Sequence, residues 1–222
     1  MCTTSALIFC FSNIAPDEIA GKRVLEVGSA NVNGSVRQVL KGWKPSEYIG
    51  VDVVGGDGVD RIVDVTKLLD VFPHDSFDVV ISTEMLEHVR DWRAAIHNIK
   101  TVAAPGALII ITTRSWGFPF HAYPHDFWRY ELSDMATIFG DLQIEKLESD
   151  PTDPGVFLRA RKPLNIKECE ISNHLLYNVM TGIRAQRIDE ADIKATHYRW
   201  LVLRMWATKA VRRVWHKLAP PI

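Results

Sequence analysis

Residues 24–35 read VLEVGSANVNGS, an apolar segment that runs directly into small residues and then into a helical pattern. The apolar part is typical of a buried strand, and Gly28 and Gly34 bound the turn that follows it. Glycines let the backbone pass close to a ligand at the carboxyl end of a strand, where open α/β sheets bind their ligands. The stretch therefore predicts a first strand followed by a ligand-binding turn.

Short apolar, β-branched segments alternate with helical patterns from residue 23 onward. Strands are predicted at 23–27, 48–51, 61–63, 77–82 and 107–112, and 142–148 and 155–161 add a closing antiparallel pair. This alternation predicts an α/β fold with a doubly wound, mostly parallel, seven-stranded Rossmann-like sheet and helices on both of its faces.

The clearest helix is predicted between strands 77–82 and 107–112. Asp91 is a suitable N-cap, Pro105-Gly106 stops the helix, and apolar residues recur between them at helical spacing. This stripe consists of Trp92, Ala95, Ile96, Ile99 and Val102. A shorter apolar segment, 6–11, predicts an N-terminal helix that covers an edge of the core.

The chain has 222 residues, of which 47% are hydrophobic and 24% charged, and this suits one sizeable core with an appendage. We predict one domain over residues 1–163 and a helical C-terminal extension over 164–222, where only helices are expected. Its last helix, 196–218, is basic and amphipathic. The apolar stripe holds Trp200, Leu203, Trp206, Ala207, Ala210, Val211, Val214 and Leu218, and the basic face holds Lys209, Arg212, Arg213 and His216.

Three contacts suit this last helix. No acidic residue follows Asp192, although seven basic residues do: Lys194, Arg199, Arg204, Lys209, Arg212, Arg213 and Lys217. The apolar stripe can pack on the chain's own core or on a second subunit in a dimer. Aromatic residues opposite basic ones also suit an anionic membrane surface, as in a peripheral membrane protein.

The cysteines indicate neither a disulfide framework nor a zinc site. Cys2, Cys10 and Cys169 are odd in number and lack paired or metal-ligand spacing, so no metal site is expected. The apolar run 6–11 is too short to span a bilayer and lacks the basic leader of a signal peptide. A cytoplasmic location is the simplest expectation, with peripheral attachment to a membrane as the alternative.

Acidic residues follow the second and third strands. Asp52 can accept hydrogen bonds from both hydroxyls of a ribose, and Asp64 can accept one from the exocyclic amine of adenine. A dinucleotide site also fits these positions, but it needs three spaced glycines facing a pyrophosphate. Here Ala30 stands at the middle glycine position and Glu26 lies just before Gly28. A carboxylate suits a sulfonium and ammonium cation better than it suits a pyrophosphate.

With these features the chain resembles the class I S-adenosylmethionine-dependent methyltransferases, specifically the small-molecule group called methyltransferase type 11. The resemblance covers about residues 21–161, and its matching segments are 24–35, 50–52, 63–64, 77–88 and 104–107. The chain departs from the family pattern at Ala30, where many members have glycine, and at Gly106-Ala107, which lacks a second glycine. These departures concern the shape of a loop more than the cofactor.

The resemblance implies that S-adenosylmethionine is the cofactor and assigns its contacts by position. It implies Glu26, Gly28 and Ser29 at the methionine portion, Asp52 at the ribose, Asp64 at the adenine, and Thr83, Glu84 and Met85 as the wall beside the cofactor. Each position also has a structural alternative. The glycines can be plain turn residues, the two aspartates solvated carboxylates, and Glu87-His88 a surface pair.

The loop after the fifth strand, 115–130, reads SWGFPFHAYPHDFWRY and predicts a lid over an acceptor pocket. Histidine suits a general base at neutral pH, so His121 and His125 are the catalytic candidates, with Asp126 as orienting group or alternative base. His88 is a further candidate. In the structural alternative, Asp126 forms an ion pair with Arg129 and Trp128 anchors the loop in the core.

The acceptor class is narrowed by what the sequence lacks. After the fourth strand there is no Asn/Asp-Pro-Pro-aromatic motif to clamp a base amine and no Pro-Cys nucleophile, so nucleic acid bases are disfavoured as acceptors. We predict in-line methyl transfer to a hydroxyl, or an amine, of a small-molecule acceptor under the lid. The alternatives are a methyltransferase-like scaffold or binding protein without turnover and a nicotinamide-dependent oxidoreductase. The stretched glycine turn disfavours the oxidoreductase.

Overall fold

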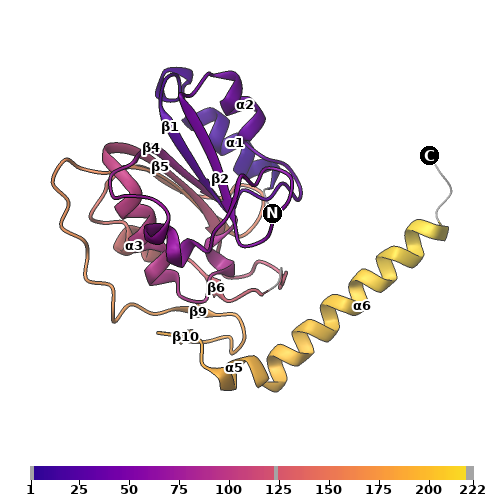
Figure 1. Ribbon diagram of the computed structural model, residues 1–222. Helices are drawn as coiled ribbons and strands as arrows, with labels where there is room; N and C mark the ends of the chain where they lie inside the picture. Colours follow the sequence, from indigo (N-terminus) through magenta and orange to yellow (C-terminus); the bar gives the residue numbers. More distant parts are fainter. Residues whose placement is uncertain (1–2, 123–124, 219–222) are drawn as a thin grey trace.

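The computed structural model describes residues 3–122 and 125–218, with side chains up to residue 207 (Figure 1). Its centre is a seven-stranded sheet with the strand order β3-β2-β1-β4-β5-β8-β7. The strands are β1 (Arg23–Val27), β2 (Glu47–Asp52), β3 (Arg61–Ile62), β4 (Phe77–Thr83), β5 (Ala103–Arg114), β7 (Gln143–Ser149) and β8 (Gly155–Arg161). All neighbours from β3 to β5 pair in parallel, whereas β8 pairs antiparallel with both β5 and β7. The predicted doubly wound, mostly parallel sheet is confirmed.

Helices cover both faces of this sheet, because side chains of alternate strand residues are buried on opposite sides. Apolar residues of α1 (Thr4–Asn13) and α2 (Arg37–Gly42) form one buried cluster with strand residues such as Val24 and Ile81. The other face carries α3 (Trp92–Val102), the 3-10 helix η2 (Val65–Asp70) and α4 (Leu132–Ile138). The carboxyl ends of the parallel strands remain available for a site.

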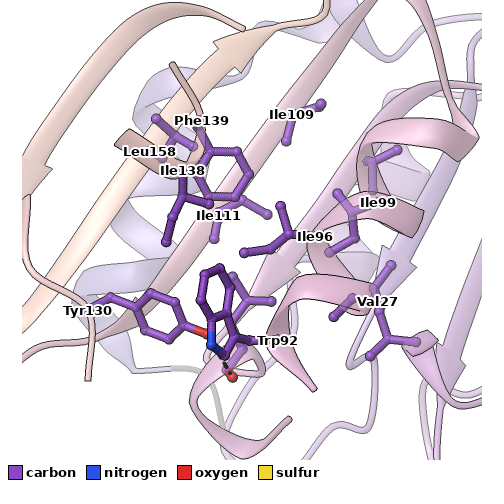
Figure 2. Close-up of a cluster of buried hydrophobic side chains, with 14 of the residues drawn as sticks. Val27, Trp92, Ile96, Ile99, Ile109, Ile111, Tyr130, Ile138, Phe139 and Leu158 are labelled. Atoms are coloured by element: carbon purple, nitrogen blue, oxygen red, sulfur yellow. Dashed lines mark hydrogen bonds between the residues drawn. The ribbon is translucent and has the colours of Figure 1, made fainter. Parts of the chain in front are cut away.

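The predicted helix after β4 is confirmed as α3, and its apolar stripe is buried. The Asp91 carboxylate caps it by accepting a hydrogen bond from the Ala94 amide at 3.2 Å. Figure 2 shows Trp92, Ile96 and Ile99 in one cluster with sheet residues such as Ile111. The helix ends at Val102 and β5 begins at once, so Pro105-Gly106 lies inside the first part of that strand rather than in a loop.

The prediction that only helices follow Pro163 is wrong for the first part of the extension. β9 (Leu176–Asn178) pairs antiparallel with both β10 (Arg184–Ala185) and β6 (Trp128–Arg129), which gives a second, three-stranded sheet. Strands of two or three residues are too short to show the alternation that identifies a strand in a sequence. The extension is therefore tied to the loop that follows β5.

Helical structure resumes with α5 (Glu190–Lys194) and α6 (Thr196–Leu218), and α6 extends away from the sheet (Figure 1). Trp200, Leu203 and Trp206 are 52%, 68% and 60% exposed, so they do not pack on the chain's own core. The predicted basic face and the stripe from Ala210 onward lie outside the described side chains. Contact with a second subunit or a membrane surface stays a prediction. In the described ranges, no helix has the length and apolar character needed to cross a membrane.

Candidate cofactor and acceptor site

A cavity of about 470 Å³ lies at the carboxyl ends of β1, β2 and β4. It brings together five of the predicted cofactor residues, Gly28, Asp52, Asp64, Glu84 and Met85. Most of the remaining wall is apolar, with valines from β1, β2 and the segment after β3. An apolar cleft with a few polar groups at this edge of an α/β sheet is the usual setting for a small organic ligand.

Gly28 is required by the shape of the cavity wall. Its φ of +79° lies in the left-handed region, which residues with a side chain rarely adopt. A Cβ atom at this position would stand 2.6 Å from Cγ of Met85. The glycine therefore allows Met85 to close on the first turn and form the side of the cavity.

Asp52 is held by the backbone around it. Its Oδ2 accepts a hydrogen bond from the Ala30 amide at 3.1 Å, and its Oδ1 accepts one from the Val54 amide at 3.3 Å. These bonds fix the carboxylate at the cavity wall, where each oxygen retains lone pairs for a ligand hydroxyl. Asp64 has a second task, because its Oδ1 caps η2 by accepting from the Thr66 amide at 2.9 Å.

The other three predicted cofactor residues, Glu26, Ser29 and Thr83, are buried and absent from the cavity wall among the described residues. Glu26 follows the alternation along β1, so its side chain lies on the face opposite that of Val27. Its Oε2 accepts a hydrogen bond from the Tyr48 hydroxyl at 2.8 Å. Burial raises the pKa of Glu26 to about 7, although Tyr48 and Arg37 oppose this.

This raised pKa predicts a pH-dependent gain in stability for Glu26→Gln. The folded protein holds a proton on Glu26 up to about pH 7, whereas the unfolded chain loses it near the ordinary value of 4.5. Glu26 therefore costs stability as pH rises from about 4.5 to 7. By urea unfolding, Glu26→Gln should match the parent at pH 4.5 and exceed it at pH 8 by about 1–3 kcal/mol. A difference that is equal at both pH values contradicts this account. Glu47→Gln is the control, because this half-exposed glutamate lies on β2 and pairs with Arg23 at the surface.

The loop after β5 is anchored by a buried ion pair. The Arg129 guanidinium contacts the Asp126 carboxylate at 2.5 Å, and the Trp128 side chain is completely buried. The structural alternative, an Asp126–Arg129 ion pair with Trp128 as a core anchor, is thus confirmed. His121 contacts the same carboxylate, with its Nδ1 3.0 Å from Asp126 Oδ2. Burial opposes ionisation of Asp126, but Arg129 and His121 hold its pKa well below its usual range.

The three catalytic candidates of the loop differ in their surroundings. Burial alone would lower the pKa of His121, but the Asp126 and Glu87 carboxylates outweigh it and raise this pKa to about 9. An imidazole that is protonated at neutral pH cannot take a proton from an acceptor. His125 is exposed, and its Nδ1 lies 3.5 Å from the hydroxyl of Tyr198 near the start of α6. Among the described residues, the loop candidates do not line the cavity.

Two residues outside the loop, one of them the further candidate His88, connect the cavity with it. Glu87 and His88 lie on the 3-10 helix η3 (Leu86–His88), directly after β4, and His88 is part of the cavity wall. Glu87 is completely buried, so Glu87-His88 is not a surface pair. Its Oε2 accepts a hydrogen bond from the Thr113 hydroxyl at 3.0 Å. The rings of His88 and His121 are 4.8 Å apart, which places the loop against the cavity.

Arg114 is a residue that sequence reasoning missed, because a lone arginine at a strand end gives no signal. Its side chain is completely buried and forms ion pairs with Glu84 and with Asp150, the latter at 3.1 Å. It also donates a hydrogen bond to the Thr3 hydroxyl at 2.9 Å. Burial and the nearby Glu87 raise the pKa of Glu84, and Arg114 opposes this shift. Arg114 thus stabilises a cavity wall and attaches the segment before α1.

Known proteins resemble this chain in sequence family and in fold. A family model described as a methyltransferase domain matches residues 9–142. No curated protein sequence matches the chain. Among solved structures, the chain is similar to the 1,6-didemethyltoxoflavin N1-methyltransferase of Burkholderia thailandensis, which was solved with bound 1,6-didemethyltoxoflavin and S-adenosylhomocysteine. The TM-score is 0.58 and the sequence identity 11%, and the match covers 72% of this chain and 77% of that chain.

Two further structures share the fold. A Haloferax volcanii methyltransferase in complex with the Trm112 activator has a TM-score of 0.55 and 15% identity, and 72% of this chain and 89% of that chain are covered. The N-methyltransferase NodS of Bradyrhizobium japonicum has a TM-score of 0.52 and 17% identity, with 72% and 93% covered. At these identities the likeness concerns the fold.

Proposed function

Because this chain belongs to the family of methyltransferase domains and uses S-adenosylmethionine as its cofactor, we propose that it methylates a hydroxyl or amine of a small-molecule acceptor. The observation that carries this proposal is the cavity at the strand ends, whose wall joins Gly28, Asp52 and Met85 to His88. One end of the cavity fits the cofactor, and the end at His88 adjoins the loop rich in aromatic and histidine residues.

The cofactor is held by residues of the cavity wall in this proposal. Asp52 accepts hydrogen bonds from the ribose hydroxyls, Asp64 lies beside the adenine, and Gly28 and Met85 border the methionine portion. The apolar valines of the wall pack on the adenine ring. Glu26 and Ser29 act from behind the first turn, where they shape the backbone rather than contact the ligand.

The acceptor binds between His88 and the loop 115–122, and this position supports an in-line reaction. A lone pair of the acceptor attacks the methyl carbon, the carbon–sulfur bond breaks, and the sulfonium becomes the neutral thioether of S-adenosylhomocysteine. Positioning of the two reactants supplies much of the acceleration. The ring of Phe118 lies beside His121 in this loop, with ring centres 5.0 Å apart. An aromatic ring at this place favours an acceptor with apolar character.

The test combines cofactor binding with an acceptor screen. Calorimetric titration with S-adenosylhomocysteine should give saturable binding to one site per chain. Purified protein with S-adenosylmethionine should then release S-adenosylhomocysteine when small phenols, alcohols or amines are added, but not with oligonucleotides. Cofactor binding without turnover across the small-molecule panel would favour a scaffold or binding protein. Absence of cofactor binding at near-millimolar ligand would overturn the proposal.

A further inference from the structure

Three side chains from two separate segments come close together beside the cavity. They are Glu87 and His88, directly after β4, and His121 in the loop after β5. One potential ligand atom from each residue lies within 4.8 Å of the other two. Glu87 Oε1 is 3.9 Å from His88 Nε2 and 3.7 Å from His121 Nε2. These separations are too long for hydrogen bonds.

The separations suit ligands of a shared metal ion. Zinc bonds to histidine nitrogen and carboxylate oxygen are about 2.0–2.2 Å long, so tetrahedral ligand atoms lie about 3.4 Å apart. The Glu87 oxygen is within about 0.5 Å of that spacing from each histidine nitrogen. The ligand atoms of the two histidines lie within 4.8 Å of one another, so the loop that carries His121 has to close on His88 when the ion binds. The side chains of His88 and His121 are 13% and 16% exposed, so both remain in contact with solvent.

Every other polar atom of the three side chains already has a partner. His88 Nδ1 lies 2.5 Å from the backbone oxygen of His125, and His121 Nδ1 lies 3.0 Å from Asp126 Oδ2. The second carboxylate oxygen of Glu87 accepts the hydrogen bond from Thr113. Histidines that bind metals almost always donate their other ring N–H to a carboxylate or a backbone carbonyl. Both histidines here are oriented in that manner.

The remaining carboxylate oxygen is the independent sign of a missing partner. Glu87 Oε1 is buried and accepts no hydrogen bond within the described ranges of the chain. A buried carboxylate oxygen without a hydrogen bond is costly, and the nearest ring nitrogens, at 3.7 and 3.9 Å, are too far away to donate one. A cation between this oxygen and the two Nε2 atoms would satisfy it.

We propose that Glu87, His88 and His121 bind a divalent transition metal ion, Zn²⁺ being the best match to two imidazoles and one carboxylate, and that the ion takes an oxygen of the acceptor. Three protein ligands with an open fourth position are typical of catalytic zinc. A hydroxyl bound to the ion loses its proton to solvent more readily, and the resulting oxyanion attacks the methyl carbon. The acceptor role rests on the proposed methyl transfer, but binding of the ion does not.

The ion gives His121 and Asp126 roles that differ from the predicted ones. His121 Nε2 faces Glu87 Oε1 at 3.7 Å, so it is placed to bind the ion rather than to take a proton from the acceptor. His121 then acts as a ligand and Asp126 as its orienting partner. The acceptor class follows from this arrangement: a phenol or alcohol whose oxygen can coordinate a metal is favoured over an amine that is protonated at neutral pH.

The experiment is calorimetric titration of metal-stripped protein with Zn²⁺, repeated with Co²⁺ by visible absorption. The parent should bind one ion per chain, with Co²⁺ bands typical of nitrogen and oxygen ligands. His121→Ala and the isosteric Glu87→Gln should each weaken Zn²⁺ binding at least tenfold, and Asp126→Asn by about 10–100-fold. His97→Ala is the matched control, since this half-exposed histidine pairs with Glu168 away from the cluster. It should bind Zn²⁺ like the parent.

Circular dichroism establishes that each variant is folded, and S-adenosylhomocysteine titration of the same samples separates the two proposals. Zn²⁺ affinity that is equal in the parent and in folded Glu87→Gln overturns the metal site, even where the cofactor binds. Zn²⁺ binding that is lost in Glu87→Gln supports the site, even where S-adenosylhomocysteine does not bind. If Zn²⁺ binds and S-adenosylhomocysteine does not, the metal site stands and only the proposed methyl transfer is overturned. With a productive acceptor, turnover should fall on metal removal and return with Zn²⁺.

Discussion

Replacement of Asp52 by alanine should weaken the binding of S-adenosylhomocysteine at least about 100-fold, because a charged acceptor for two ribose hydroxyls is lost. Asp52 is already positioned by the Ala30 and Val54 amides, so the ligand does not have to order it. The variant should fold normally, since the side chain lies at a cavity wall rather than in the core. Calorimetric titration of parent and variant measures the effect.

Two further variants show whether the effect belongs to the carboxylate. Asp52→Asn keeps one acceptor oxygen and should fall between the parent and Asp52→Ala. Asp70→Ala removes an exposed carboxylate at the end of η2, away from the cavity wall, and should bind like the parent. If Asp52→Ala binds the ligand within a factor of three of the parent, the ribose does not lie at this position.

Arg114→Met should lower the free energy of unfolding by about 3–5 kcal/mol, the usual cost of breaking a buried ion pair from one side. The substitution leaves the Glu84 and Asp150 carboxylates without their buried cation and removes the hydrogen bond to Thr3. Methionine fills much of the same volume, so packing contributes little to the loss. Urea unfolding of the parent and the variant measures it.

A second substitution distinguishes charge from packing at Arg114. Adding Glu84→Gln to Arg114→Met removes one of the stranded carboxylates and should recover part of the lost stability. Arg187→Met serves as the surface control, because its side chain is 80% exposed, and should change stability by less than about 1 kcal/mol. A double variant no more stable than Arg114→Met would contradict the charge argument.

The large elements were predictable because burial leaves a strong pattern in the sequence. Parallel strands covered on both faces are continuous apolar runs, as in residues 77–83, and α3 shows its buried stripe directly. The last helix was also predicted with its bounds, 196–218. The second sheet was not predictable, since β6, β9 and β10 are too short for periodicity and arise from tertiary pairing.

The site was predictable where a residue's place follows from its strand. Gly28, Asp52 and Asp64 lie at strand ends, and parallel strands bring such ends to one edge of the sheet. The direction of the Glu26 side chain depends on alternation within β1, which the motif alone did not reveal. His88 and His121 were predicted singly as candidate bases, but their grouping with Glu87 was not, because metal-ligand spacing was sought only among the cysteines. A Glu-His pair after β4 and a histidine after β5 were its signal.

The pairing of β6 with β9 has a consequence for how this enzyme can be redesigned. The family match ends at residue 142, yet β9 lies at Leu176–Asn178. The next residue, Val179, holds the loop after β5, because its amide donates to the Phe127 carbonyl at 2.9 Å. Trp116 packs on Tyr177 as well, with ring centres 4.7 Å apart. A chimaera that imports residues 115–130 from a relative without residues 176–185 would separate two segments that pack as one unit, so the two segments must be grafted together.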